Sequence, residues 1–137
     1  MNPTKFTIQP SFFSGRPQVL VQNGPLQVTA LRYRSGVCGL KIQNEQCSMV
    51  VLPYMGMQIW YAEFCGKNLT MKSIFDEPLA TTKYGDNYGA LLLHCGITNL
   101  GCPPEGEDYP LHGELPFGSY SEVYTATGND EKGPYIS

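Results

Sequence analysis

The chain has 137 residues, of which 42% are hydrophobic and 15% are charged, and its formal net charge is −3. This length predicts one domain, residues 1–137, with enough apolar side chains for a core. Its nine Lys and Arg residues are scattered, whereas a nucleic-acid partner would require clustered positive charge. No apolar run approaches the length needed to cross a bilayer, so we expect no membrane partner.

The cysteines and the N-terminus suggest a cellular compartment. Five cysteines, an odd number, are present without a Cys-x-x-Cys pair, which is typical of reduced thiols in a cytoplasmic protein. The first 15 residues contain no uninterrupted apolar region of the kind found in signal peptides. The sequence therefore predicts a cytoplasmic protein.

Short apolar runs separated by Gly and Pro predict an all-β chain. Alternation of apolar and polar residues predicts strands at 26–30 and 40–43. A run that is apolar on both faces predicts a third strand at 48–52, stopped by Pro53. The aromatic-rich run 57–64 predicts a fourth. With brief connections between them, these four strands should form an antiparallel meander.

The second half of the chain is less regular. Residues 66–87 show no clear period, and residues 89–95 form another apolar run. A loop rich in Gly and Pro follows at 96–110, and a loop of this length is more often functional than idle. A final strand is predicted at 122–127, with a hairpin turn at 128–130 leading into the last residues.

Three stretches carry a resemblance to a known family. Gly56-Met57-Gln58-Ile59-Trp60, followed by Gly66-Lys67-Asn68-Leu69, is similar to two early turns of mutarotase-like proteins. Residues 88–101 look like the Cys-Gly-Leu-x-Asn-x-Gly stretch of a poorly characterised branch. Tyr109-Pro110-Leu111-His112-Gly113-Glu114 resembles the Leu-His-Gly signature of the sugar site. Together they resemble the aldose 1-epimerase-like (galactose mutarotase-like) superfamily over roughly residues 26–125, which corresponds to the N-terminal portion of its longer members.

The resemblance implies a fold and a chemistry. The fold would be part of an antiparallel β-sandwich, the galactose mutarotase-like supersandwich, and the ligand a monosaccharide or sugar derivative. Mutarotation needs a base at the C1 hydroxyl and an acid at the ring oxygen. In the family, both groups come from later sequence and have no counterpart here. The catalytic residues are therefore unknown, and we expect sugar binding with weak or absent isomerase activity.

Three residues are the candidate sugar contacts: His112, Asn99 and Glu114. His112 matches the family histidine that holds the sugar. Asn99 could bond a sugar hydroxyl, although Asn is equally a routine turn residue. Glu114 would share a face with His112 in an extended chain, but a solvated carboxylate is the more common role. We expect His94 to be a satisfied core or interstrand histidine and Trp60 to belong to the core.

No metal site or other cofactor is predicted. His94 and Cys95 are adjacent, so in a strand they would point to opposite faces and could not readily share one ion.

Other functions remain open at this stage. A truncated structural or interaction module would keep the fold and bind no sugar. An isomerase could take its missing groups from a second copy, and a sensor would bind sugar without turnover. We also expect a homo-oligomer formed through exposed sheet edges.

Overall fold

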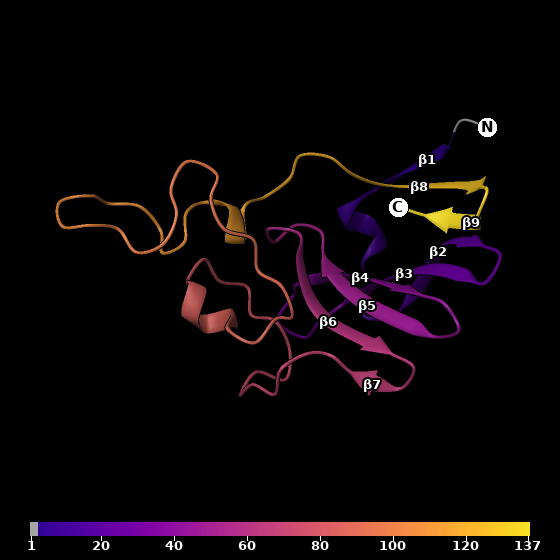
Figure 1. Ribbon diagram of the computed structural model, residues 1–137, viewed down its shortest axis with the longest axis horizontal. Coiled ribbons are helices and arrows are strands. Elements are labelled where there is room, and N and C mark those ends of the chain that lie inside the picture. The colour runs from indigo at the N-terminus through magenta and orange to yellow at the C-terminus, as the bar shows by residue number, and fades with distance from the viewer. Residues whose placement is uncertain (1–2) are drawn as a thin grey trace.

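The computed structural model describes residues 3–137 and contains two antiparallel sheets (Figure 1). The larger sheet has the strand order β2-β3-β4-β5-β6-β7, and the smaller has the order β1-β8-β9. The predicted all-β fold with antiparallel sheets is confirmed. The strands are β1 (Thr4–Ile8), β2 (Gln18–Asn23), β3 (Leu26–Arg32), β4 (Cys38–Gln43), β5 (Cys47–Leu52), β6 (Gln58–Phe64), β7 (Lys67–Asn68), β8 (Val123–Asp130) and β9 (Gly133–Ile136).

Helical structure is limited to three short 3-10 turns in the described residues. These are η1 (Pro10–Phe12), η2 (Tyr84–Asn87) and η3 (Leu115–Phe117). No helix within residues 3–137 has the length and apolar character needed to cross a membrane.

The four strands predicted between residues 26 and 64 are β3 to β6, and they form the expected meander. Alternation sets the register, since Val28 pairs with Ile42 and Ala30 with Leu40. Val28 and Ala30 are fully buried, while Thr29 between them is half-buried. The alternation of apolar and polar residues therefore correctly predicted which face of β3 packs into the core.

One core cluster lies between the two sheets. Val28, Ala30 and Leu40 of the large sheet belong to it with Ile8 of β1 and Val123 of β8. Figure 1 shows the small sheet beside the β2 end of the large one. The Asn23 side chain ties the sheets together there, because its amide donates to the carbonyl oxygens of two residues of the β8–β9 hairpin, Gly128 at 2.8 Å and Tyr135 at 3.1 Å.

A second core cluster includes Val50, Leu52 and Trp60. Trp60 is 8% exposed, as expected for a core residue. The cluster also includes Ala90, and Phe75 and Leu93 pack against it. These residues come from the segment between β7 and β8, which has almost no regular structure. An irregular segment therefore completes this core.

The structure differs from the sequence expectations in three places. Strands β1 and β2 precede the predicted meander, and the two-residue strand β7 follows it. The apolar run 89–95 contributes only an isolated bridge, between Leu92 and Ile59, instead of a full strand. The last strand continues through 128–130, so the hairpin turn falls at residues 131–132 and not where it was predicted.

Gly128 explains the misplaced turn. It pairs with Tyr135 across the β8–β9 hairpin. A Cβ atom at this position would lie 2.6 Å from the Tyr135 hydroxyl. The glycine therefore makes room for a cross-strand aromatic ring instead of forming a turn.

The segment before β6 anchors the loop that precedes β8. The Gly56 backbone N–H donates to the Gly118 carbonyl oxygen at 2.8 Å. The Gln58 side-chain amide donates to the Pro116 carbonyl oxygen at 2.7 Å, and Gln58 is fully buried. Gly56 has φ of 57°, and a Cβ there would overlap the carbonyl oxygens of Leu115 and Pro116. Close packing of backbone on backbone thus fixes where residues 115–118 lie.

Replacing Gly56 with alanine should test this anchor. Gly66 is the matched control, since its φ is 74° but a Cβ there meets nothing within 4 Å. We expect Gly66→Ala to lower the free energy of unfolding by about 1–2 kcal/mol through backbone strain alone. Gly56→Ala should cost about 1–3 kcal/mol more because of the overlap. Urea unfolding measures both, and equal losses would contradict the anchoring role.

Candidate functional site

The candidate residues lie in a projecting loop, residues 96–114, which we call the arm. In Figure 1 it is the orange loop that extends furthest from the sheets. Backbone hydrogen bonds close its base. Gly96 N–H donates to the His112 carbonyl at 3.0 Å, and His112 N–H donates to the Gly101 carbonyl at 2.7 Å. Leu115 N–H donates to the Gly96 carbonyl at 2.7 Å. The arm is therefore an ordered loop with a defined attachment.

His112 lies at the base of the arm. Its φ is 63° and that of Gly113 is 84°, so two successive residues are in the left-handed region. Such a backbone is uncommon for residues other than glycine. The imidazole is half-buried and packs against the Tyr84 ring in a tilted arrangement, with 4.3 Å between centroids and 44° between planes. The ring orientation is thus set by both the backbone and an aromatic partner.

Tyr84 was not singled out from the sequence. It begins η2, within the segment 66–87 that shows no clear period in the sequence. Burial raises the pKa of its hydroxyl, and the neighbouring Cys95 and Tyr88 raise it further. The hydroxyl is therefore uncharged at neutral pH and can both donate and accept hydrogen bonds. The pair Tyr84-Gly85 is too common in proteins to indicate from sequence that Tyr84 contacts His112.

Glu114 holds the two sides of the arm together. Its Oε1 accepts hydrogen bonds from the backbone N–H groups of Thr98 at 2.6 Å and Ile97 at 2.8 Å. The Thr98 bond is the largest cause of a lowered pKa, and bonds from the backbone N–H of Glu114 itself and from Ile97 add to it, so that the carboxyl has a pKa of about 2. An acid this strong is ionised at neutral pH and is a weak base. The Glu114 carboxylate therefore positions the backbone at Ile97 and Thr98 and is not suited to proton transfer.

Asn99 contacts the site through its backbone. A Cβ at Gly113 would overlap the Asn99 carbonyl oxygen and would lie 3.0 Å from that of Gly96. Glycine at 113 therefore allows the His112 turn to pack directly on residues 96–99. The Asn99 side chain itself is half-buried. All three predicted residues, His112, Asn99 and Glu114, thus meet where the two sides of the arm join.

His94 lies apart from this contact. One nitrogen of its half-buried ring is 3.3 Å from the Met57 carbonyl oxygen, so it links the run after Leu92 to the start of β6. This agrees with the expected structural role. Within residues 3–137, no three His, Cys, Asp or Glu side chains gather closely enough to hold a metal ion.

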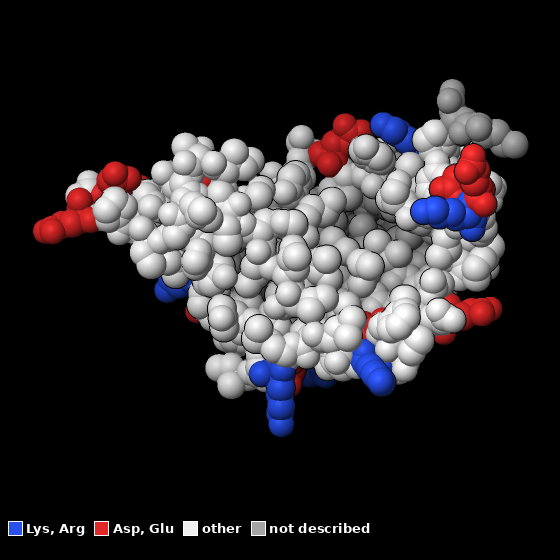
Figure 2. All heavy atoms as spheres, in the orientation of Figure 1, with Lys and Arg blue, Asp and Glu red and all other residues white. Residues whose placement is uncertain are grey.

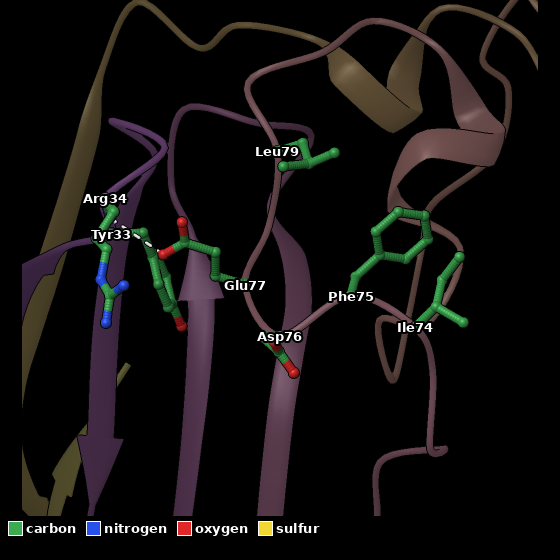
Figure 3. A pocket seen from close by; sticks show the side chains of 7 residues that line it. All are labelled: Tyr33, Arg34, Ile74, Phe75, Asp76, Glu77 and Leu79. Atoms are coloured by element: carbon green, nitrogen blue, oxygen red, sulfur yellow. Dashed lines mark hydrogen bonds between the residues drawn. The ribbon is translucent and has the colours of Figure 1, made fainter.

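A separate hollow of about 470 Å³ opens beside the turn after β3 (Figure 3). Glu77 forms one wall, and its carboxylate accepts backbone N–H bonds from Arg34 at 3.0 Å and Ser35 at 3.1 Å. Burial, followed by the Glu77 charge, raises the pKa of Tyr33 to about 12. This carboxylate therefore holds a turn as Glu114 holds the arm.

No family model, curated protein or solved structure matches the chain. The resemblance to the aldose 1-epimerase-like superfamily therefore rests on the three sequence stretches alone, and assignment of a sugar to the arm remains a proposal.

The lowered pKa of Glu114 predicts an acid-sensitive arm. A carboxyl with a folded-state pKa of about 2 and an ordinary value of 4.5 stabilises the fold fully above pH 4.5. This stabilisation is lost as the pH falls from 4.5 towards 2. The Ile97 and Thr98 amides should then exchange faster with solvent, as followed by NMR hydrogen exchange.

Glu114→Gln is the matched variant, because it keeps an acceptor oxygen and removes the charge. Its Ile97 and Thr98 amides should exchange faster than wild type at neutral pH, with little further change in this acidic range attributable to residue 114. A Glu114 carboxyl that titrates near 4.5 in the wild-type chain would rule out the proposed bonding.

Proposed function

We propose that the chain binds a neutral monosaccharide at the base of the arm, with His112 as the principal contact. The observation that carries this proposal is the fixed imidazole. His112 has a left-handed backbone, packs against Tyr84 at a tilt and remains partly exposed. A ring held in one orientation can donate or accept a hydrogen bond to a sugar hydroxyl without losing freedom on binding. The Leu-His-Gly resemblance supports the same role.

The neighbouring groups suit recognition better than catalysis. The Tyr84 hydroxyl is neutral, and aromatic faces match the C–H surfaces of pyranoses. Glu114 uses its carboxylate to bind Ile97 and Thr98, and its low pKa makes it a poor proton acceptor or donor at neutral pH. We therefore assign no catalytic residue. The proposed activity is binding, with isomerisation left to a chain that supplies a base and an acid.

An interaction module is the second candidate, and one observation favours it. Ile97 is 82% exposed and Leu100 is 69% exposed, both on the arm. Exposed apolar side chains grouped on a projection are typical of protein contact surfaces. This function does not depend on sugar binding.

Ligand-observed NMR against a panel of aldoses tests the sugar proposal. Wild-type protein should broaden the signals of at least one sugar, and His112→Ala should abolish the effect. His112→Asn is the second variant, because Asn tolerates the left-handed backbone but lacks the ring. It should also lose binding. His94→Ala should keep binding, since His94 contacts the Met57 carbonyl instead. Folded wild-type protein that binds none of the sugars would overturn the proposal.

A further inference from the structure

The arm has the character of a docking element. Ile97 and Leu100 are largely exposed, and Leu111 is 40% exposed. The backbone that carries them is ordered by the bonds at the arm base and by Tyr109, whose hydroxyl donates to the Cys102 carbonyl at 3.1 Å. An ordered projection with exposed apolar side chains indicates a surface that another molecule covers.

The arm also carries only negative charge. The chain has no Lys or Arg between Lys83 and Lys132, although eight of its twelve acidic residues follow Lys83. Glu105, Glu107 and Asp108 are exposed near the arm tip. Figure 2 shows acidic side chains at the far end of the projection. The surface that covers the arm should therefore be both apolar and basic.

One described region of the same chain has this complementary character. It is the segment 64–72 around the edge strand β7, which we call the β7 end. Phe64 is 49% exposed, Leu69 is 55% and Met71 is 53%. Lys67 and Lys72 lie among them and are exposed. Figure 2 shows basic side chains along the lower edge of the molecule, where Figure 1 places β7.

Glu63, which directly precedes the β7 end, already accepts a hydrogen bond from its own strand. The Tyr61 hydroxyl donates to the Glu63 carboxylate at 2.6 Å, and Glu63 is half-buried. Segment 64–72 itself contains no Asp or Glu, so Lys67 and Lys72 give the β7 end its charge. β7 pairs with β6 on one side only, and its short outer edge leaves backbone groups free for a partner.

We propose that the arm of one copy docks on the β7 end of a second copy. The arm and the β7 end project from different parts of one chain (Figure 1), so the contact is intermolecular. The apolar residues Ile97, Leu100 and Leu111 pack against Phe64, Leu69 and Met71, and the arm carboxylates face Lys67 and Lys72. Reciprocal docking closes a dimer, whereas one-way docking builds a ring or chain. The expected homo-oligomer thereby gains a specific interface, and sugar binding has no part in it.

Charge reversal tests the interface by sedimentation velocity over a range of protein and salt concentrations. Wild-type protein should self-associate, and the association should weaken as salt screens the charges. The arm variant Glu105→Lys/Glu107→Lys/Asp108→Lys should weaken it at least about tenfold, because lysines then face lysines. The β7 variant Lys67→Glu/Lys72→Glu should do the same. An equimolar mixture of the two variants should associate again, since each supplies the charge that the other lacks.

The control reverses three exposed acids away from both surfaces, Glu122→Lys, Asp130→Lys and Glu131→Lys. It changes the net charge as much as the arm variant does and should leave association unchanged. Recovery in the mixture also shows that both variants are folded. A wild-type chain that stays monomeric at every concentration overturns the proposal. Association that neither variant weakens, or that the mixture does not restore, overturns it as well.

Discussion

Burial on both faces of the large sheet is the constraint on which the rest of the structure depends. One face packs on the small sheet through Val28, Ala30 and Leu40. The other carries Val50, Leu52 and Trp60, and it is covered by a segment with almost no regular structure. Such a segment leaves many backbone N–H and C=O groups without partners in a helix or strand, and these need other hydrogen bonds wherever they are buried. The irregular cover obtains these bonds partly from backbone groups of its own turns and of β6, and partly from side chains.

Three polar side chains bind backbone groups of turns and loops in a similar way. The Glu77 carboxylate accepts two consecutive backbone N–H bonds from Arg34 and Ser35, and Glu114 does so from Ile97 and Thr98. Fully buried Asn87 exchanges two hydrogen bonds with the Leu79 backbone. Each holds a turn or loop at one point. The Glu114 bonds lie at the candidate site, whereas Asn87 belongs to η2, the same short 3-10 turn that carries Tyr84.

Periodicity predicted the part of the fold whose residues obey a simple pattern. β3 to β6 alternate or are continuously apolar, and their turns are short, so their strands and meander followed from sequence. β2 was not predicted because a bulge between Val19 and Val21 interrupts its alternation of apolar and polar residues. The turn after β8 was misplaced because Gly128 serves cross-strand packing on Tyr135. The run after Gly89 looked like a strand but forms one bridge with Ile59. At the candidate site, a motif indicated His112, whereas nothing in the sequence linked it to Tyr84, 28 positions earlier.

The distribution of the cysteines has a practical consequence for solution studies. Cys65, Cys95 and Cys102 are exposed, while Cys38 and Cys47 are half-buried. Cys102 lies on the arm, Cys95 directly precedes it, and Cys65 lies at the β7 end. Thiol-directed probes should therefore react first at these three positions. The chain carries native attachment points for fluorophores or spin labels at the arm and at the β7 end, so the motion of each can be followed without introducing a foreign residue.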